Sequence, residues 1–150
     1  MAPARAPRHL ARYSLLEDPV KNFWAVAIGA AIGGVSRYYL SLFATLRLGD
    51  ALPWATLIIN VTGSFVLGFL MRFALASPAA NVELRLLLAT GFCGGYTTFS
   101  TYSYEVALLI EEGQYERAAA YALGSVVLAL LATFAGFLVA RELMAGRAQP

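Results

Sequence analysis

Four long apolar stretches, separated by short polar connections, set the pattern of hydrophobic and polar positions along this chain. They predict helices over residues 22–46, 54–76, 83–111 and 117–143. Each stretch is long enough to cross the hydrocarbon core of a bilayer, which takes about 20 residues. The pattern therefore predicts a transmembrane domain over residues 22–145, between a basic N-terminal tail, 1–21, and a short C-terminal tail, 146–150.

The third stretch contains an unusual polar segment, residues 91–105, which reads GFCGGYTTFSTYSYE. Glycine weakens a helix by roughly 1 kcal/mol relative to alanine, so Gly91, Gly94 and Gly95 predict a break in the helix between residues 91 and 95. In hydrocarbon, broken backbone is tolerated only where protein buries it or where it lines a wet cavity. The segment indicates either an ion-binding break near the bilayer midplane or a packing surface for a neighbouring helix.

Two of the predicted helices carry polar side chains at intervals of about four residues, which places them on one face. These residues are Thr56, Asn60 and Ser64 in the second helix, and Tyr121, Ser125 and Thr133 in the fourth, where Ala129 interrupts the row. Amide and hydroxyl groups are the donors that a small anion needs when it leaves water. Hydrogen bonding between helices is the alternative for each row.

Two charged side chains fall inside the predicted spans, where a charge is costly unless it pairs, reaches the interface or faces water. Arg37 shares a face of the first helix with Gly29 and Gly33. It is interpreted either as a snorkelling or ion-paired residue or as an anion-attracting residue in a vestibule. Glu105 is interpreted either as a functional carboxyl or as a protonated or hydrogen-bonded structural one.

The composition agrees with a membrane protein. Hydrophobic residues make up 59% of the 150 residues and mean hydropathy is +0.65, whereas the apolar share of soluble domains is about 45–50%. The basic residues lie mostly at helix ends and predict no nucleic-acid partner. With one cysteine, one histidine, no catalytic triad and no phosphate-binding loop, the sequence argues against an intrachain disulfide, a histidine metal cluster and an enzyme.

The run GGYTTFSTYSYE at 94–105 resembles the third-helix signature GGxTTFSTFSxE of the Fluc (CrcB) family of fluoride channels. The runs GGVSRY at 33–38 and TLIINVTGSF at 56–65 extend the resemblance over about residues 22–140. It implies an all-α integral membrane protein of the bacterial cytoplasmic (inner) membrane, with four transmembrane helices, a broken third helix and an antiparallel, dual-topology dimer. It further implies a passive channel that exports fluoride down its electrochemical gradient through two pores per dimer.

The resemblance also implies roles for individual residues. The rings of Phe99 and Tyr102 would present their positive edges to fluoride, with Tyr102 standing where the family commonly has phenylalanine. Backbone carbonyls of Gly94 and Thr97 from both subunits would hold a structural sodium ion (Na+) at the dimer centre. The predicted fluoride pathway comprises Thr56, Asn60, Ser64, Phe99, Tyr102, Ser103, Tyr121, Ser125 and Thr133, with Arg37 in the vestibule and Glu105 as a further candidate.

The distribution of basic residues is uneven for a protein that inserts in both orientations. Eight lie on the side of the predicted termini, against Arg47 and Arg117 on the other side, which predicts termini in the cytoplasm. The expected partner is a second copy of the chain, and an oppositely oriented homologue is the alternative. Two other functions stay open: a small proton-coupled exporter of the multidrug type that uses Glu105, and a membrane scaffold that transports nothing.

Overall fold

The computed structural model describes residues 18–49, 52–73 and 81–147, and the secondary structure of this part of the chain is entirely helical. The elements are α2 (Pro19–Leu48), α3 (Trp54–Phe73), α4 (Val82–Arg85), the π-helix η1 (Leu86–Cys93), α5 (Gly94–Tyr96), α6 (Phe99–Glu111) and α7 (Tyr115–Arg147). Three of them, α2, α3 and α7, are long and apolar enough to cross a membrane.

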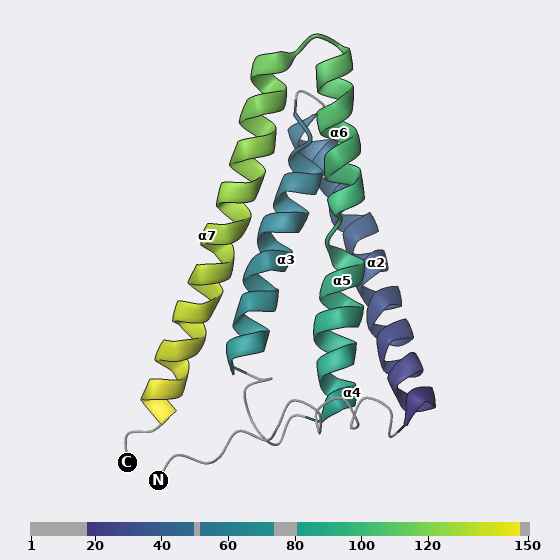
Figure 1. The fold of residues 1–150 in the computed structure, drawn as a ribbon, viewed down its shortest axis with the longest axis vertical. Coiled ribbons are helices and arrows are strands. Elements are labelled where there is room, and N and C mark those ends of the chain that lie inside the picture. The colour runs from purple at the N-terminus through teal and green to yellow at the C-terminus, as the bar shows by residue number, and fades with distance from the viewer. Residues whose placement is uncertain (1–17, 50–51, 74–80, 148–150) are drawn as a thin grey trace.

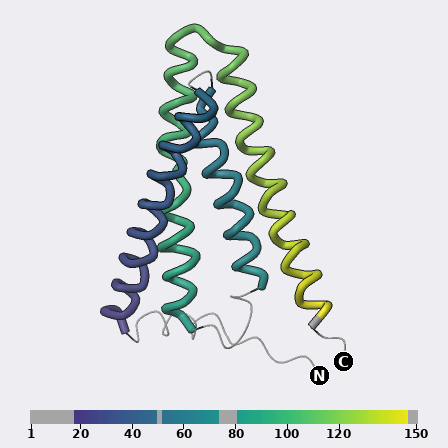
Figure 2. Tube along the Cα trace, turned by 180° about the vertical axis from the view of Figure 1, so that it is seen from behind, coloured from purple at the N-terminus to yellow at the C-terminus, as the bar shows by residue number. Residues whose placement is uncertain are grey.

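The helices form a splayed bundle (Figure 1). At one end α6 and α7 make a hairpin, whose turn contains Gly113 at a φ of 73°. Toward the other end, where α2 begins and α7 ends, the helices spread apart, and the view from behind shows the same arrangement (Figure 2). Because α3 packs mainly against α7, and α2 mainly against η1 and α5, the segment from α4 to α6 connects the two sides of the bundle.

The ends of the first and last helices differ from the prediction. Asp18 and Pro19, assigned to the tail, are the N-cap and first residue of α2, in keeping with the preferences of aspartate and proline for these positions. Asp18 accepts the Lys21 backbone N–H at 3.2 Å and pairs with its ammonium group at 2.7 Å, and the hydrogen bonds from Lys21 lower the pKa of the Asp18 carboxyl. At the other end α7 continues to Arg147. Residues 1–17, 74–76 and 148–150 lie outside the described part of the chain.

The interruption of the third predicted helix lies at residues 97 and 98, not at 91–95. Gly91 and Gly95 are helical and lie against α2, where an added Cβ would come within 2.9 Å of the Gly29 Cα and 2.6 Å of the Ala30 carbonyl oxygen, respectively. These glycines therefore serve close backbone packing, as the packing interpretation predicted. The helix breaks instead where the Thr98 side chain and the Asn60 amide replace its backbone hydrogen bonds.

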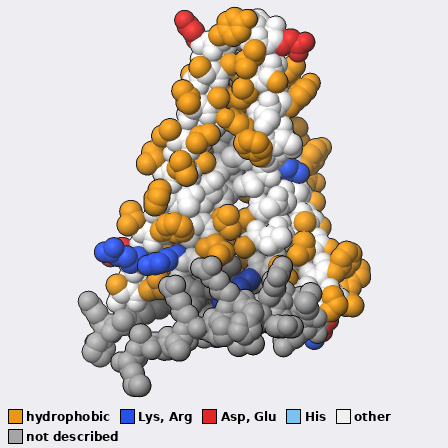
Figure 3. Space-filling view, viewed as in Figure 1, with side chains coloured by type: hydrophobic (Ala, Val, Ile, Leu, Met, Phe, Trp, Pro, Cys, Tyr) orange, Lys and Arg blue, Asp and Glu red, His pale blue; other side chains and the backbone are white. Residues whose placement is uncertain are grey.

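The surface of the bundle is strongly apolar. Hydrophobic side chains cover its full height in Figure 3, and many large ones are exposed on α2, α3 and α7. The buried cluster is small and consists of Leu109, Ala118 and Tyr121, with Leu57, Tyr102 and Val106 packed against it. A surface with this much exposed apolar area suits contact with lipid or with another protein subunit.

Candidate functional site

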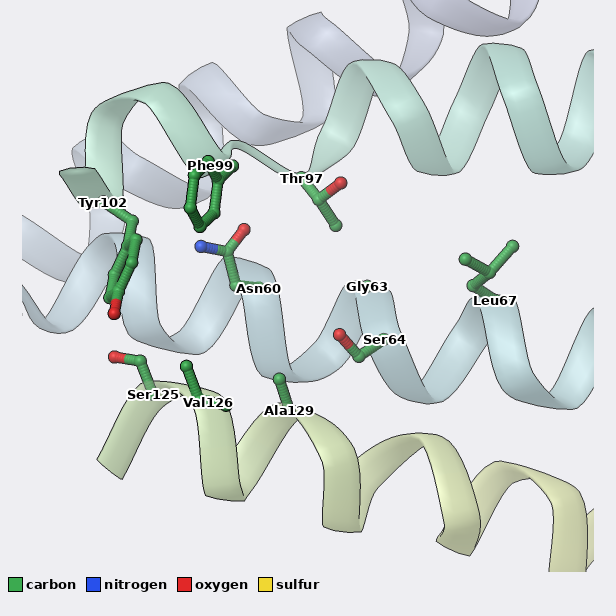
Figure 4. A pocket seen from close by; sticks show the side chains of 10 residues that line it. All are labelled: Asn60, Gly63, Ser64, Leu67, Thr97, Phe99, Tyr102, Ser125, Val126 and Ala129. Atoms are coloured by element: carbon green, nitrogen blue, oxygen red, sulfur yellow. The ribbon is translucent and has the colours of Figure 1, made fainter. Parts of the chain in front are cut away.

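A cavity of about 250 Å³ lies beside the helix break, between α3, α6 and α7 (Figure 4). Its wall consists of Asn60, Gly63, Ser64, Leu67, Thr97, Phe99, Tyr102, Ser125, Val126 and Ala129. Five of these, Asn60, Ser64, Phe99, Tyr102 and Ser125, belong to the predicted anion pathway. The fold thus brings residues from three distant parts of the chain to one site.

Asn60 closes the break in the helix. Its Nδ2 donates to the Thr98 carbonyl at 3.0 Å, and its Oδ1 accepts the Thr98 N–H at 2.9 Å. In a continuous α-helix that N–H would donate to the Gly94 carbonyl. The Asn60 amide therefore replaces bonds that the unwound backbone has lost, which is the interhelical role left open by the sequence. Because an amide carries two N–H groups, one remains for a group in the cavity.

Thr98 also begins α6. Its Oγ1 accepts the Thr101 N–H at 3.2 Å as an N-cap, so this N–H is diverted from the Thr97 carbonyl, its partner in a continuous helix. The carbonyls predicted to hold sodium are those of Gly94 and Thr97. In each case the N–H that would donate to that carbonyl in a continuous helix donates to a side chain instead. Hard cations bind oxygen ligands of this kind, so the donor set fits the ion that was predicted.

The two predicted rings both reach the cavity. The centroids of Phe99 and Tyr102 are 5.4 Å apart, and Figure 4 shows Phe99 beside Asn60 and Tyr102 directed toward α7. Tyr102 is half-buried and its hydroxyl donates to the Ala122 carbonyl at 3.1 Å. Phe99 is 76% exposed. The extra hydroxyl of Tyr102 therefore fixes its ring to α7, whereas the Phe99 ring is open to its surroundings.

Ser125 is a buried polar residue whose hydroxyl finds no hydrogen-bond partner among the described residues. It is 6% exposed, and its Oγ has no hydrogen bond within the described part of the chain. Figure 4 places this hydroxyl on the Tyr102 side of the cavity. A buried, unsatisfied polar group costs about 1–3 kcal/mol. The buried position of the Ser125 hydroxyl is explained if it donates a hydrogen bond to an acceptor that enters the cavity.

Glu105 stands outside this cavity, in a cluster with two other predicted pathway residues. Thr56 Oγ1 donates to its Oε1 at 2.7 Å, and the Tyr121 hydroxyl donates to its Oε2 at 2.6 Å. The cluster joins α3, α6 and α7, and Thr56 and Glu105 also line a second hollow, of about 280 Å³, near the start of α3. Glu105 is thus the hydrogen-bonded carboxyl of one interpretation, and both hydroxyls are committed to it.

The other predicted residues lie near the cavity or apart from it. Ser103 and Thr133 donate their hydroxyls to carbonyls four residues earlier in their own helices, at 2.9 and 3.0 Å. Ser64 is part of the cavity wall. Arg37 is half-buried in α2, is not part of that wall, and makes no ion pair with another described residue.

Sequence reasoning missed two parts of the site. The apolar wall was not predicted, and Ala129, treated as a gap in the polar row of α7, is a member of it. Thr98 was part of the signature but was given no role. A hydroxyl residue directly before a helical run is a helix-start signal, and this signal could have placed the break at residues 97 and 98.

Comparison with known proteins identifies the family of this chain. The family model described as CrcB-like protein, Camphor Resistance (CrcB), matches residues 24–137. Proteins from Rhizobium meliloti (strain 1021) and Geobacter sulfurreducens are each 45% identical over 119 residues, or 79% of this chain and 95% and 96% of their own lengths. A third, from Pelobacter propionicus, is 45% identical over 127 residues, or 85% of this chain and 98% of its own length. All three are named fluoride-specific ion channel FluC. The chain is therefore an integral membrane protein that belongs to the CrcB family.

Proposed function

We propose that this protein is a passive, fluoride-selective channel that exports fluoride from the cytoplasm down its electrochemical gradient. The observation that carries the proposal is the cavity beside the broken helix. There the spare N–H of Asn60 and the unpartnered hydroxyl of Ser125 meet the rings of Phe99 and Tyr102, and no charged side chain is among the wall residues. The names of the relatives, which specify fluoride, support the same ion.

The physical reasoning concerns how an anion is held and released. Fluoride is small and strongly hydrated, so a pathway must replace its water with closely spaced donors. Neutral amide, hydroxyl and ring-edge donors can do so. Conduction also requires that the ion leave, which favours several weak sites over one strong one. A wall without a fixed cation meets both requirements.

The architecture of the channel is part of the proposal. The segment from α4 to α6 runs from the spread end of the bundle to the hairpin end (Figure 1), and we infer that it makes a fourth membrane crossing. Two chains of opposite orientation would then pair as a homodimer in the bacterial inner membrane and form two pores. The exposed ring of Phe99 and the open space around Gly94, where an added Cβ would have no neighbour within 4 Å, support a partner at this position.

Sodium would occupy the dimer centre in this arrangement. The carbonyls of Gly94 and Thr97 from both subunits would hold it, since their helical donors are diverted to Asn60 and Thr98. Its role would be structural, because it would neutralise carbonyl dipoles brought together at a crossing of two broken helices. An oppositely oriented homologue is the alternative partner, favoured by the excess of basic residues on the terminal side.

The direct test is an efflux assay on the purified full chain. Liposomes loaded with fluoride are made permeable to potassium, and the external fluoride is followed with an ion-selective electrode. We expect rapid fluoride efflux and no comparable efflux of chloride from matched vesicles. Vesicles that stay tight to fluoride, although they contain folded protein, would contradict the channel and support a non-transporting scaffold.

Ser125→Ala is expected to slow fluoride efflux about tenfold, because one hydrogen bond to a charged group is worth about 1.5 kcal/mol. Thermal stability should change little, since Ser125 Oγ has no partner to lose within the described part of the chain. Efflux and a melting curve are measured on the same preparation. Ser36→Ala, in α2 and outside the cavity wall, is the control. Equal effects of the two changes would remove Ser125 from the pathway.

Glu105→Gln separates the channel from a proton-coupled exporter. The amide keeps one oxygen acceptor for Thr56 or Tyr121 but cannot exchange a proton at physiological pH. For a channel we expect efflux to fall by less than about tenfold, roughly the worth of one hydrogen bond, and to stay independent of a pH gradient. Transport that is driven by a pH gradient in the wild type and abolished by this change would favour the exporter. Efflux is measured with and without an imposed pH gradient.

A further inference from the structure

A third hollow lies toward the spread end of the bundle, away from the anion cavity and from the hollow beside Glu105. It has a volume of about 460 Å³ and is lined by Met71 and Arg72 of α3 and by Phe137, Leu138 and Arg141 of α7. Two arginines from neighbouring helices therefore share one hollow with three apolar side chains. Figure 3 shows basic side chains over the lower part of α7 with hydrophobic side chains around them.

The two guanidinium groups have no protein counter-charge in the described part of the chain. Neither Arg72 nor Arg141 makes an ion pair or hydrogen bond with another described side chain. Glu142 follows Arg141 directly, but successive residues of a helix project about 100° apart. The hollow therefore has a local positive charge to which the described chain supplies no partner.

Helix lengths place this charge at the boundary of the membrane. From Trp54 to Arg72, α3 rises about 27 Å, and from Arg117 to Arg141, α7 rises about 36 Å. The hydrocarbon core is about 30 Å thick, and tryptophan is typical of the interface. If Trp54 and Arg117 lie at one interface, the backbone of Arg72 lies at the opposite edge of the hydrocarbon core and that of Arg141 lies beyond it. The long arginine side chains can reach the headgroups from both positions.

We propose that this hollow binds one anionic membrane phospholipid. The planar guanidinium groups of Arg72 and Arg141 match the oxygens of a headgroup phosphate, to which arginine can donate two parallel hydrogen bonds. Met71, Phe137 and Leu138 offer an apolar surface for the first part of an acyl chain. A soluble phosphate would meet the arginines alone, whereas a phospholipid fits both parts of the hollow. The inference is independent of which ion the protein conducts.

Native mass spectrometry of the full chain tests this site. The protein is equilibrated with equal amounts of phosphatidylglycerol and phosphatidylcholine, and the retained lipid is counted. We expect preferential retention of phosphatidylglycerol, and Arg72→Gln/Arg141→Gln should reduce the preference by about 25-fold, or roughly fivefold per arginine near an anionic lipid surface. Arg117→Gln is the matched control, because Arg117 lies at the opposite end of α7 and donates to the Gln114 side-chain oxygen at 2.8 Å.

Other outcomes would overturn the proposal. These are an unchanged preference in the double variant, an equal loss in the Arg117 control, and displacement of the bound lipid by an excess of inorganic phosphate, which would make free phosphate the ligand. Size-exclusion chromatography shows whether the double variant folds. Should it fail to fold, Arg72→Lys/Arg141→Lys keeps both charges without the planar fork, and we then expect an intermediate preference; full retention by the lysine variant would contradict recognition by guanidinium groups.

Discussion

Asn60→Ala is expected to lower fluoride efflux by about 100-fold or more. The change removes both hydrogen bonds to the Thr98 peptide and also the spare amide donor of the cavity. Each unsatisfied buried group costs about 1–3 kcal/mol, and the cost in hydrocarbon is at the upper end because no water replaces the partner. Losing two bonds is therefore sufficient to move the break, and with it Phe99 and Thr97. Efflux from liposomes, normalised to folded protein, measures the effect.

Thr62→Val is the matched control for this experiment. Thr62 lies two residues further along α3, and its hydroxyl bonds to the Tyr96 hydroxyl at 2.8 Å and to the Ile58 carbonyl at 2.7 Å. It is not part of the cavity wall. We expect near-normal efflux from this variant. If Asn60→Ala also conducted normally, the pairing of Asn60 with Thr98 would have no role in the pathway.

Gly33→Ala is expected to prevent assembly of the bundle or to weaken it severely. An added Cβ would overlap the Phe92 carbonyl oxygen and lie 2.9 Å from the Tyr96 nitrogen, and both atoms belong to the backbone of the α4–α6 segment. Backbone atoms cannot relieve the overlap by changing rotamer as a side chain can, so α2 must move away from the α4–α6 segment. We expect the free energy of unfolding to fall by about 3 kcal/mol or more and the melting temperature to fall by about 10 °C or more. Both are measured on purified protein in detergent.

Gly34→Ala provides an adjacent control in the same helix. An added Cβ at Gly34 has no neighbour within 4 Å, and alanine favours a helix by about 1 kcal/mol over glycine. This variant should therefore be as stable as the wild type or slightly more stable. Equal damage from the two substitutions would show that Gly33 acts through local helix geometry and not through contact with Phe92.

The sequence was sufficient to predict three membrane-spanning helices and half of the cavity wall. Long apolar runs predicted the α2, α3 and α7 spans, because burial in lipid requires continuous apolar length. The four-residue spacing placed Asn60 and Ser64 on one face of α3, and both line the cavity. The rings of Phe99 and Tyr102, whose roles the family resemblance implied, line the cavity as well.

The position of the break could not be predicted in this way, because it depends on contacts between distant residues. Local propensity pointed to glycines, but Gly91 and Gly95 are held in helix by close packing against α2. Thr98 is released from the helix by Asn60, a residue 38 positions earlier. The pairing of Thr56 and Tyr121 with Glu105 likewise joins three helices. Periodicity within one helix does not reveal partners in another.

The way in which the Thr98 peptide is fastened bears on how conduction would be regulated. Its N–H and its carbonyl are both hydrogen-bonded to one amide side chain, which holds the backbone at the helix break in one conformation. We therefore expect a permanently open leak, with current records that lack long closures. A pore that does not close can preserve the membrane potential only by excluding the other ions of the cell.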